Sequence, residues 1–287
     1  MADVIVVFLV WFAVVALLCA VAIARADRWR APRWAHSLGA RLAAYGRGSV
    51  ATIGRPATGI VVALAGWSVV IIAGWLLGVA AHRLQNAVDW PCFHWWQDHY
   101  LTGSWHRVWW TLTNIGSPTV TQILTVAGAV LLAALYYGKP QWWAPPIILL
   151  VSYLAEKYSQ TILKLVVNRG HPPTTHGTWP SGGMGRLIDV YGLIIYFVIL
   201  RFWPHSRRAW AYGGSFLALA ASVQAYARLN NLEHWTTDVV GGAVYGLLLL
   251  LTFVLAHRAL MAATIVAPPA PGETAAPAEP DKPKLTV

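Results

Sequence analysis

Arg228-Leu-Asn-Asn-Leu-Glu-His234-Trp-Thr-Thr-Asp238 is a polar stretch between two strongly apolar ones. Charged and titratable side chains at the rim of a membrane helix are costly unless something uses them. His234 and Asp238 are four residues apart, so they share a face if a helix begins near Glu233. Asp238 would then orient the imidazole, whose other nitrogen could attack phosphorus, and Arg228 would bind phosphate. The alternative is an interfacial His beside a helix-starting Asp.

The composition is that of an integral membrane protein. Of 287 residues, 57% are hydrophobic and 11% are charged, whereas a soluble domain has about 25% charged residues. The net charge of +10 does not indicate nucleic-acid binding, because most Arg residues lie in predicted loops and no basic-aromatic groove motif is present. Two cysteines, one in an apolar span and one in a loop, argue against a disulfide framework.

A membrane-spanning helix needs about 20 mainly apolar residues. The sequence predicts seven such helices and no strands, so the expected fold class is an all-α, polytopic transmembrane helix bundle. The predicted spans are Val4–Ala24, Ala57–Ala81, Val120–Tyr137, Trp142–Val167, Leu187–Trp203, Ala209–Ala227 and Thr237–Ala256. We interpret the first as an uncleaved anchor, because no basic segment precedes it and positive charge follows it.

The distribution of arginine predicts the orientation and the domain organisation. Residues 1–56 form an N-terminal anchor and an Arg-rich linker, which the positive-inside bias places in the cytoplasm. Residues 57–257 form the transmembrane catalytic domain. Residues 258–287 form a Pro/Ala-rich cytoplasmic tail that we expect to be disordered. Alternation of the spans then puts three polar segments, around residues 164–171, 180–183 and 228–238, on the same outer side.

The other two polar segments also contain groups that bind anions. Lys164, Arg169 and His171 form a cationic cluster ahead of a rigid Pro-Pro pair, which can either snorkel to the interface or bind an anion. The second segment, Pro180-Ser181-Gly182-Gly183, leads into a helix, where backbone N–H groups and the Ser hydroxyl can bind phosphate. On its own, this segment is equally typical of an ordinary turn.

Together the three segments resemble the type 2 phosphatidic acid phosphatase (PAP2) superfamily, whose soluble relatives include vanadium haloperoxidases. The family pattern is Lys, six residues, Arg-Pro; then Pro-Ser-Gly-His; then Ser-Arg, five residues, His, three residues, Asp. Here Lys164 and Pro180-Ser181-Gly182 match the first two motifs, and Arg228, His234 and Asp238 match the third with the correct spacing. The resemblance covers roughly residues 115–256. It implies a six-helix PAP2-like core, here with one extra N-terminal span.

The resemblance also implies a role for each matching residue. Phosphate would be bound by a set of donors, and a phosphohistidine would form on His234 while Asp238 orients the ring. No cofactor and no metal are expected, because cations and amide groups supply the electrostatic stabilisation. The implied phosphate-binding residues are Lys164, Ser181, Gly182 and Arg228.

Three positions depart from the family pattern. His171 stands where the family has Arg, and Arg169, two residues earlier, is the expected replacement in phosphate binding. Ala227 replaces the family Ser. Gly183 replaces the family His, which protonates the leaving alcohol, a step generally worth about 10²–10⁴-fold. His171 or His176 is therefore a candidate proton donor. A diphosphate substrate would need less help, because its leaving group is a phosphate.

Further polar residues admit two interpretations. Arg186 and Asp189 are expected to pair with each other, although Arg186 could instead bind the phosphate. Glu156 and Lys157, in the middle of a span, are expected to make polar contacts between helices. The Trp-rich loop before residue 117 contains four His residues at spacings that fit no compact metal motif. We interpret this loop as an interfacial lid above the substrate entry.

The predicted function is an integral membrane phosphatase or phosphotransferase acting on a lipid phosphate or diphosphate. Polyprenyl phosphates and glycerolipids are the natural candidates. The arginine distribution places the active site at the outer face of the membrane. We expect this membrane to be a bacterial cytoplasmic membrane, because the abundance of Arg and Ala is typical of a GC-rich genome. The alternatives are a catalytically impaired protein that binds or transports a lipid phosphate, and a structural subunit of a cell-envelope complex. The sequence leaves open whether the chain forms a homo-oligomer.

Overall fold

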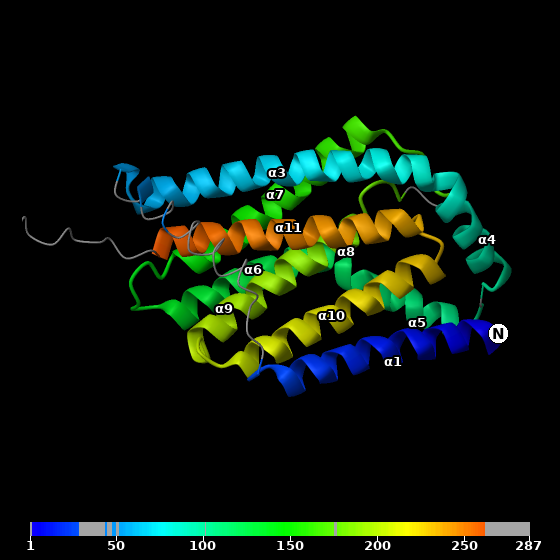
Figure 1. Ribbon diagram of the computed structural model, residues 1–287, viewed down its shortest axis with the longest axis horizontal. Coiled ribbons are helices and arrows are strands. Elements are labelled where there is room, and N and C mark those ends of the chain that lie inside the picture. Colours follow the sequence, from blue (N-terminus) through cyan, green and yellow to red (C-terminus); the bar gives the residue numbers. More distant parts are fainter. Residues whose placement is uncertain are drawn as a thin grey trace, which may run out of the picture.

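The protein is a bundle of long helices that run roughly parallel and antiparallel to one another (Figure 1). The computed structural model describes residues 2–28, 44, 48–49, 52–100, 102–174 and 177–261. Most of the Arg-rich linker, His176 and residues 262–287 of the predicted tail lie outside the described residues. Residues 258–261, which the sequence analysis assigned to the tail, belong to the last helix. The long helices are α1 (Ala2–Arg25), α3 (Arg55–Leu84), α6 (Pro118–Tyr136), α7 (Ala144–Val167), α9 (Gly192–Phe202), α10 (Arg207–Asn230) and α11 (Thr236–Met261).

Each of the seven predicted spans corresponds to one of these helices. Among the described residues, five helical segments are long and apolar enough to cross a membrane, judged by length and composition: Asp3–Arg25, Arg55–Asp98, Pro118–Tyr136, Gly182–Phe202 and Thr236–Met261. The other two, α7 and α10, are 24 residues each. Both contain charged residues near their ends or middle and lie beside the apolar helices. The all-α, multi-pass bundle predicted from the sequence is confirmed.

Short helices close one end of the bundle. The chain continues from α3 through a π-helical turn, Gln85–Asp89, into α4 (Trp90–Asp98), and α5 (Ser104–Thr113) follows. Figure 1 shows α4 and α5 at the end where α1 begins. We call this the lid end. The opposite end, where α1 stops at Arg25 and α11 stops at Met261, is the linker end.

The alternation of the helices agrees with the order predicted from the sequence. In Figure 1 α1 ends and α3 begins at the linker end, and the segments between α7 and α8 (Gly182–Arg186) and between α10 and α11 lie at the lid end. All three predicted polar segments therefore lie at one end of the bundle. The structure contains no bilayer, so the assignment of this end to the outer side stays a prediction.

The helix α11 is the centre of the core. It packs against α3, α7 and α8, and it also contacts the π-helical turn Leu187–Tyr191 that joins α8 to α9. By contrast, α1 packs at the edge of the bundle against α10, and most of its apolar side chains are exposed, as expected for a lipid-facing helix. The extra N-terminal span is thus an addition to the core.

Glycines in α11 let the second polar segment approach this helix closely. A Cβ atom added to Gly242 would lie 2.5 Å from the backbone oxygen of Ser181, and one added to Gly246 would lie 2.7 Å from that of Gly185. Real Cβ atoms do not approach so closely, and a backbone oxygen cannot rotate away. Close helix contacts through small residues are typical of membrane bundles. Here they fix the position of Ser181 and α8.

Replacing Gly242 with Ala should therefore destabilise the protein by about 1–3 kcal/mol, the usual range for overpacking a dense core. The measurement is the thermal unfolding midpoint in detergent. Gly214→Ala in α10 is the matched control, because an added Cβ there meets nothing within 4 Å, and Ala favours a helix relative to Gly. An equal loss in both variants would contradict this account of the α11 contact.

Candidate active site

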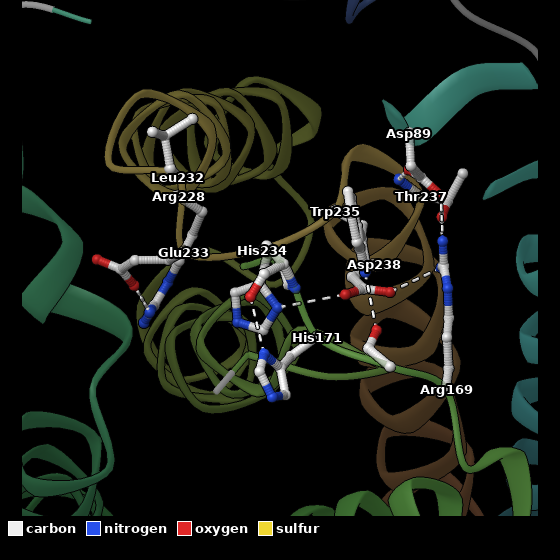
Figure 2. A network of polar contacts seen from close by, with 12 residues as sticks. Asp89, Arg169, His171, Arg228, Leu232, Glu233, His234, Trp235, Thr237 and Asp238 are labelled. Atoms are coloured by element: carbon white, nitrogen blue, oxygen red, sulfur yellow. Dashed lines mark hydrogen bonds and ion pairs between the residues drawn. The ribbon is translucent and has the colours of Figure 1, made fainter. Parts of the chain in front are cut away.

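The third polar segment places His234 directly before the first turn of α11. Its Nδ1 lies 3.6 Å from Oδ2 of Asp238, and both side chains are almost completely buried. Figure 2 shows the imidazole and this carboxylate facing each other. The two groups face each other, but α11 begins at Thr236 and not near Glu233, so the turn before the helix, and not a shared helix face, brings them together. Because Nδ1 faces Asp238, Nε2 is the nitrogen that can act as a nucleophile.

The surroundings of His234 favour a neutral imidazole. Burial lowers the pKa of His234 below its ordinary value, although the contact with Asp238 acts in the opposite direction. An imidazole with a lowered pKa is uncharged at neutral pH, and only the uncharged ring has a lone pair to donate to phosphorus. Burial therefore favours the neutral, nucleophilic form of His234 over an imidazolium ion.

Arg169 lies on the far side of Asp238 from His234 (Figure 2). Its Nη1 donates to Oδ1 of Asp238 at 2.9 Å and to Oγ1 of Thr237 at 2.6 Å, and its Nη2 is paired with Asp89. The side chains of Arg169, Asp89 and Asp238 are all completely buried. In this structure the guanidinium, which the sequence assigned to phosphate, is thus occupied by two carboxylates.

Asp89 is a residue of this network that the sequence analysis missed. It lies in the π-helical turn between α3 and α4, and its carboxylate also accepts from the backbone N–H and the hydroxyl of Thr237, both at 2.9 Å. The available signal was a single acidic residue at the outer end of a long apolar span, where a charge is costly without a partner. Successive contacts join His234 to Asp238, Asp238 to Arg169, and Arg169 to Asp89. They connect the start of α11 to the turn before α4.

Hydrogen bonds join the first and third segments. The indole of Trp235 donates to the backbone oxygen of Gly170 at 2.8 Å, and the hydroxyl of Thr174 donates to that of Leu232 at 2.7 Å. The ring of Trp235 packs edge-on against Trp90 and Phe93 of α4, with centroids 5.0 and 5.6 Å away. The Trp-rich lid therefore lies directly on the loop that holds His234.

The second segment is fixed to the third by its backbone. The N–H of Ser181 donates to the backbone oxygen of Asp238 at 3.0 Å. Ser181 is fully buried, and no hydrogen-bond partner from the described residues reaches its Oγ. Gly182 begins α8 and packs on Gln160 of α7. Ser181 and Gly182 thus lie beside the start of α11, with a hydroxyl donor available for a ligand.

Arg228 fills the place that a side chain at position 183 would need. A Cβ atom on Gly183 would lie 2.9 Å from Arg228 Cζ and 2.9 Å from Gln224 Nε2. The Arg228 guanidinium is paired with Glu233 and lies 3.5 Å from the backbone oxygen of Thr113. Glu233 was also missed by the sequence analysis, which treated it only as a helix start. A histidine at position 183 would require Arg228 to move.

Arg186 is a further cation whose charge acts on Arg228, and Lys164 is an exposed cation near Arg186. Arg186 reaches Oε1 of Gln160 at 3.0 Å and lies 3.7 Å from Glu156, whereas Asp189 accepts from Ser152 at 2.6 and 2.7 Å. The expected Arg186–Asp189 pair is therefore replaced by contacts to α7, because α8 turns Arg186 toward that helix. Lys164 is close enough to Arg186 and Asp238 for their charges to interact.

His171 is the candidate proton donor that lies among the described residues. Figure 2 shows His171 on the His234 side of Asp238. Its side chain is exposed, and its Nδ1 lies 2.7 Å from the backbone oxygen of Pro172. His176 lies outside the described residues. Within the part of the chain that the structure describes, no three His, Cys, Asp or Glu side chains gather where they could bind a metal ion.

Comparison with known proteins identifies the architecture. No family model matches the sequence, and no curated protein matches it either. The fold is similar to a solved structure described as the crystal structure of the first transmembrane PAP2 type phosphatidylglycerolphosphate phosphatase from Bacillus subtilis. The TM-score is 0.52 with 22% sequence identity, over 65% of this chain and 93% of that chain. The chain has the transmembrane PAP2 fold. At this identity the likeness concerns the fold alone.

The burial of the Arg169 network leads to a stability prediction. Arg169→Gln leaves two buried carboxylates without their shared cation, so the free energy of unfolding should fall by about 3–5 kcal/mol. Adding Asp89→Asn should recover part of this loss. The control is Arg208→Gln, which removes an ion pair with Asp27 whose side chains are 68% and 54% exposed, and should have a much smaller effect. Similar losses in Arg169→Gln and Arg208→Gln would contradict the prediction.

Proposed function

We propose that this protein is a membrane phosphatase of PAP2 type, which hydrolyses a lipid phosphate or diphosphate through a phosphohistidine on His234. The observation that carries the proposal is the buried His234–Asp238–Arg169 series. Ser181 is hydrogen-bonded to the backbone of Asp238, and the charges of Arg228 and Lys164 act on His234 and Asp238, respectively. This arrangement combines an oriented nucleophile with donors for a phosphate group, and the transmembrane PAP2 fold is consistent with the proposal. The active site faces the outer side of a bacterial cytoplasmic membrane in this proposal.

The reaction has two steps. Nε2 of His234 attacks phosphorus, the bond from phosphorus to the leaving oxygen breaks, and the developing charge on the phosphoryl oxygens is stabilised by nearby donors. Water then attacks the phosphohistidine, which releases inorganic phosphate and restores the neutral ring. The proposed phosphate-binding residues are Lys164, Ser181, Gly182, Arg186 and Arg228.

Arg169 has a different role in this proposal from the one its position in the sequence indicated. Its guanidinium is paired with both Asp238 and Asp89. We therefore propose that it is a positioning residue, which holds Asp238 in line with Nδ1 of His234. A phosphate group would compete with two buried carboxylates for this cation, and separating them from it would cost several kcal/mol.

The leaving group determines how much the lost histidine at position 183 matters. Arg228 fills the space beside Gly183, so the leaving oxygen meets a cation there instead of an imidazole acid. A guanidinium does not give up a proton near neutral pH, but it stabilises negative charge. This arrangement favours a leaving group that is already stable as an anion. The proposed preferred substrate is therefore a lipid diphosphate, whose leaving group is the lipid monophosphate anion.

The first test is His234→Asn, which removes the nucleophile and retains a polar side chain of smaller size. Phosphate release from a panel of lipid mono- and diphosphates should fall to background, and no acid-labile phosphoenzyme should form, whereas lipid binding should persist. Thermal unfolding of the variant checks that the fold is intact. If the wild-type protein releases no phosphate from any lipid in the panel, the alternative of a lipid phosphate binder or transporter replaces the proposal.

The second test concerns His171, the described candidate for the proton donor. His171→Ala should lower hydrolysis of a lipid monophosphate by about 10²–10⁴-fold, the usual contribution of a general acid. Hydrolysis of the corresponding diphosphate should change much less, because a phosphate leaves without a proton. The measurement is kcat on both substrates. Full monophosphate hydrolysis after replacement of both His171 and His176 would contradict a histidine acid in this loop.

A further inference from the structure

A second cationic pocket lies at the linker end, away from the candidate active site. It is a cavity of about 570 Å³ between the ends of α6, α9 and α11. Its lining includes Lys139, Arg201 and Arg258, together with Tyr136, Tyr196 and His257. His257 follows Asp238 by nineteen residues on α11, so the two lie roughly 28 Å apart along the helix axis at 1.5 Å per residue.

The charges in this pocket have one sign. The part of the lining that the structure describes contains three basic side chains and no carboxylate. Arg201 is held by its Nε, which donates to the backbone oxygen of Leu135 at 2.9 Å. Lys139 and Arg258 are exposed. Three cations converging on one cavity repel one another, and an anion in the cavity would relieve this repulsion.

His257 supplies the observation that separates this pocket from ordinary interfacial cations. Its side chain is buried, with 3% of the residue exposed, and no hydrogen-bond partner among the described residues reaches its Nε2. Its Nδ1 lies 3.0 Å from the hydroxyl of Tyr196. If that hydroxyl donates to Nδ1, the ring carries its proton on Nε2, which is then a buried donor without an acceptor. A buried N–H without an acceptor is unfavourable unless a ligand satisfies it.

We propose that this pocket is a second anion site, which binds a phosphate group through Lys139, Arg201, Arg258 and His257. The aromatic rings of Tyr136, Tyr196 and Trp210 form the rest of its wall, so the site combines a polar base with apolar sides. Basic pockets between transmembrane helices are suited to the head groups of anionic lipids. The same donors would also bind free inorganic phosphate. The experiment below distinguishes a lipid head group from inorganic phosphate as the ligand.

The test is native mass spectrometry of the full-length protein in detergent, with phosphatidylglycerol, phosphatidylcholine or inorganic phosphate as the probe. The variants are Arg258→Gln alone and Arg258→Gln combined with His257→Phe. The matched control is Arg208→Gln, which removes one charge at the same end outside the pocket. The candidate active site is unchanged in all of these proteins, so differences among them arise at the linker end.

The expected result is a loss of phosphatidylglycerol affinity of about tenfold in Arg258→Gln, as for one charge-assisted hydrogen bond, and more in the double variant. Arg208→Gln should bind like the wild type, and phosphatidylcholine should bind more weakly throughout. If inorganic phosphate shows the same variant dependence and displaces the lipid, the site is upheld with a soluble ligand. Equal lipid binding by the pocket variants and Arg208→Gln would overturn the proposal.

Discussion

The buried cation of Arg169 is the constraint on which the candidate site depends. Three side chains with full charges lie in the dry interior between α11 and the lid, and the arrangement is stable only because one guanidinium is shared by two carboxylates. The same contact sets the position of Asp238, and Asp238 sets the orientation of His234. Nucleophile, first segment and lid are therefore held by one electrostatic network.

Much of the fold could be predicted from hydropathy and arginine distribution, because both reflect the cost of placing polar groups in a bilayer. The weakest cases were α7 and α10, where Glu156, Lys157 and Gln224 interrupt the apolar pattern. Glu156 and Gln224 lie beside Arg186 and Gly183, so two of the residues that obscured the spans belong to the site region. The π-helical turn Leu187–Tyr191, by contrast, left no pattern in the sequence.

The site itself was only partly predictable. The pairing of His234 with Asp238 could be inferred from their closeness in the sequence, although His234 lies before the start of α11 and not on its face. The partners of Arg169 and Arg186 could not, because each pairs with a residue far away in the sequence. Arg228 pairs with Glu233 only five residues later, but the turn between α10 and α11 that brings them together was not predicted. Asp89 precedes Arg169 by eighty residues. Motif spacing places a charge near the site, but the surrounding carboxylates decide whether it points at a ligand or at another side chain.

The lid is built as an extension of a membrane helix. Residues 55–98 form one helical segment of 44 residues, roughly 66 Å of helix at 1.5 Å per residue, which is longer than a bilayer of about 45 Å including its head groups. Its bend is the turn Gln85–Asp89, and Gln85 and Asp89 both contact Arg169. The turn that leads the chain from α3 into α4 therefore also holds the guanidinium behind Asp238. One short π-helical segment ends a membrane helix, starts the lid and supplies the carboxylate that anchors the site.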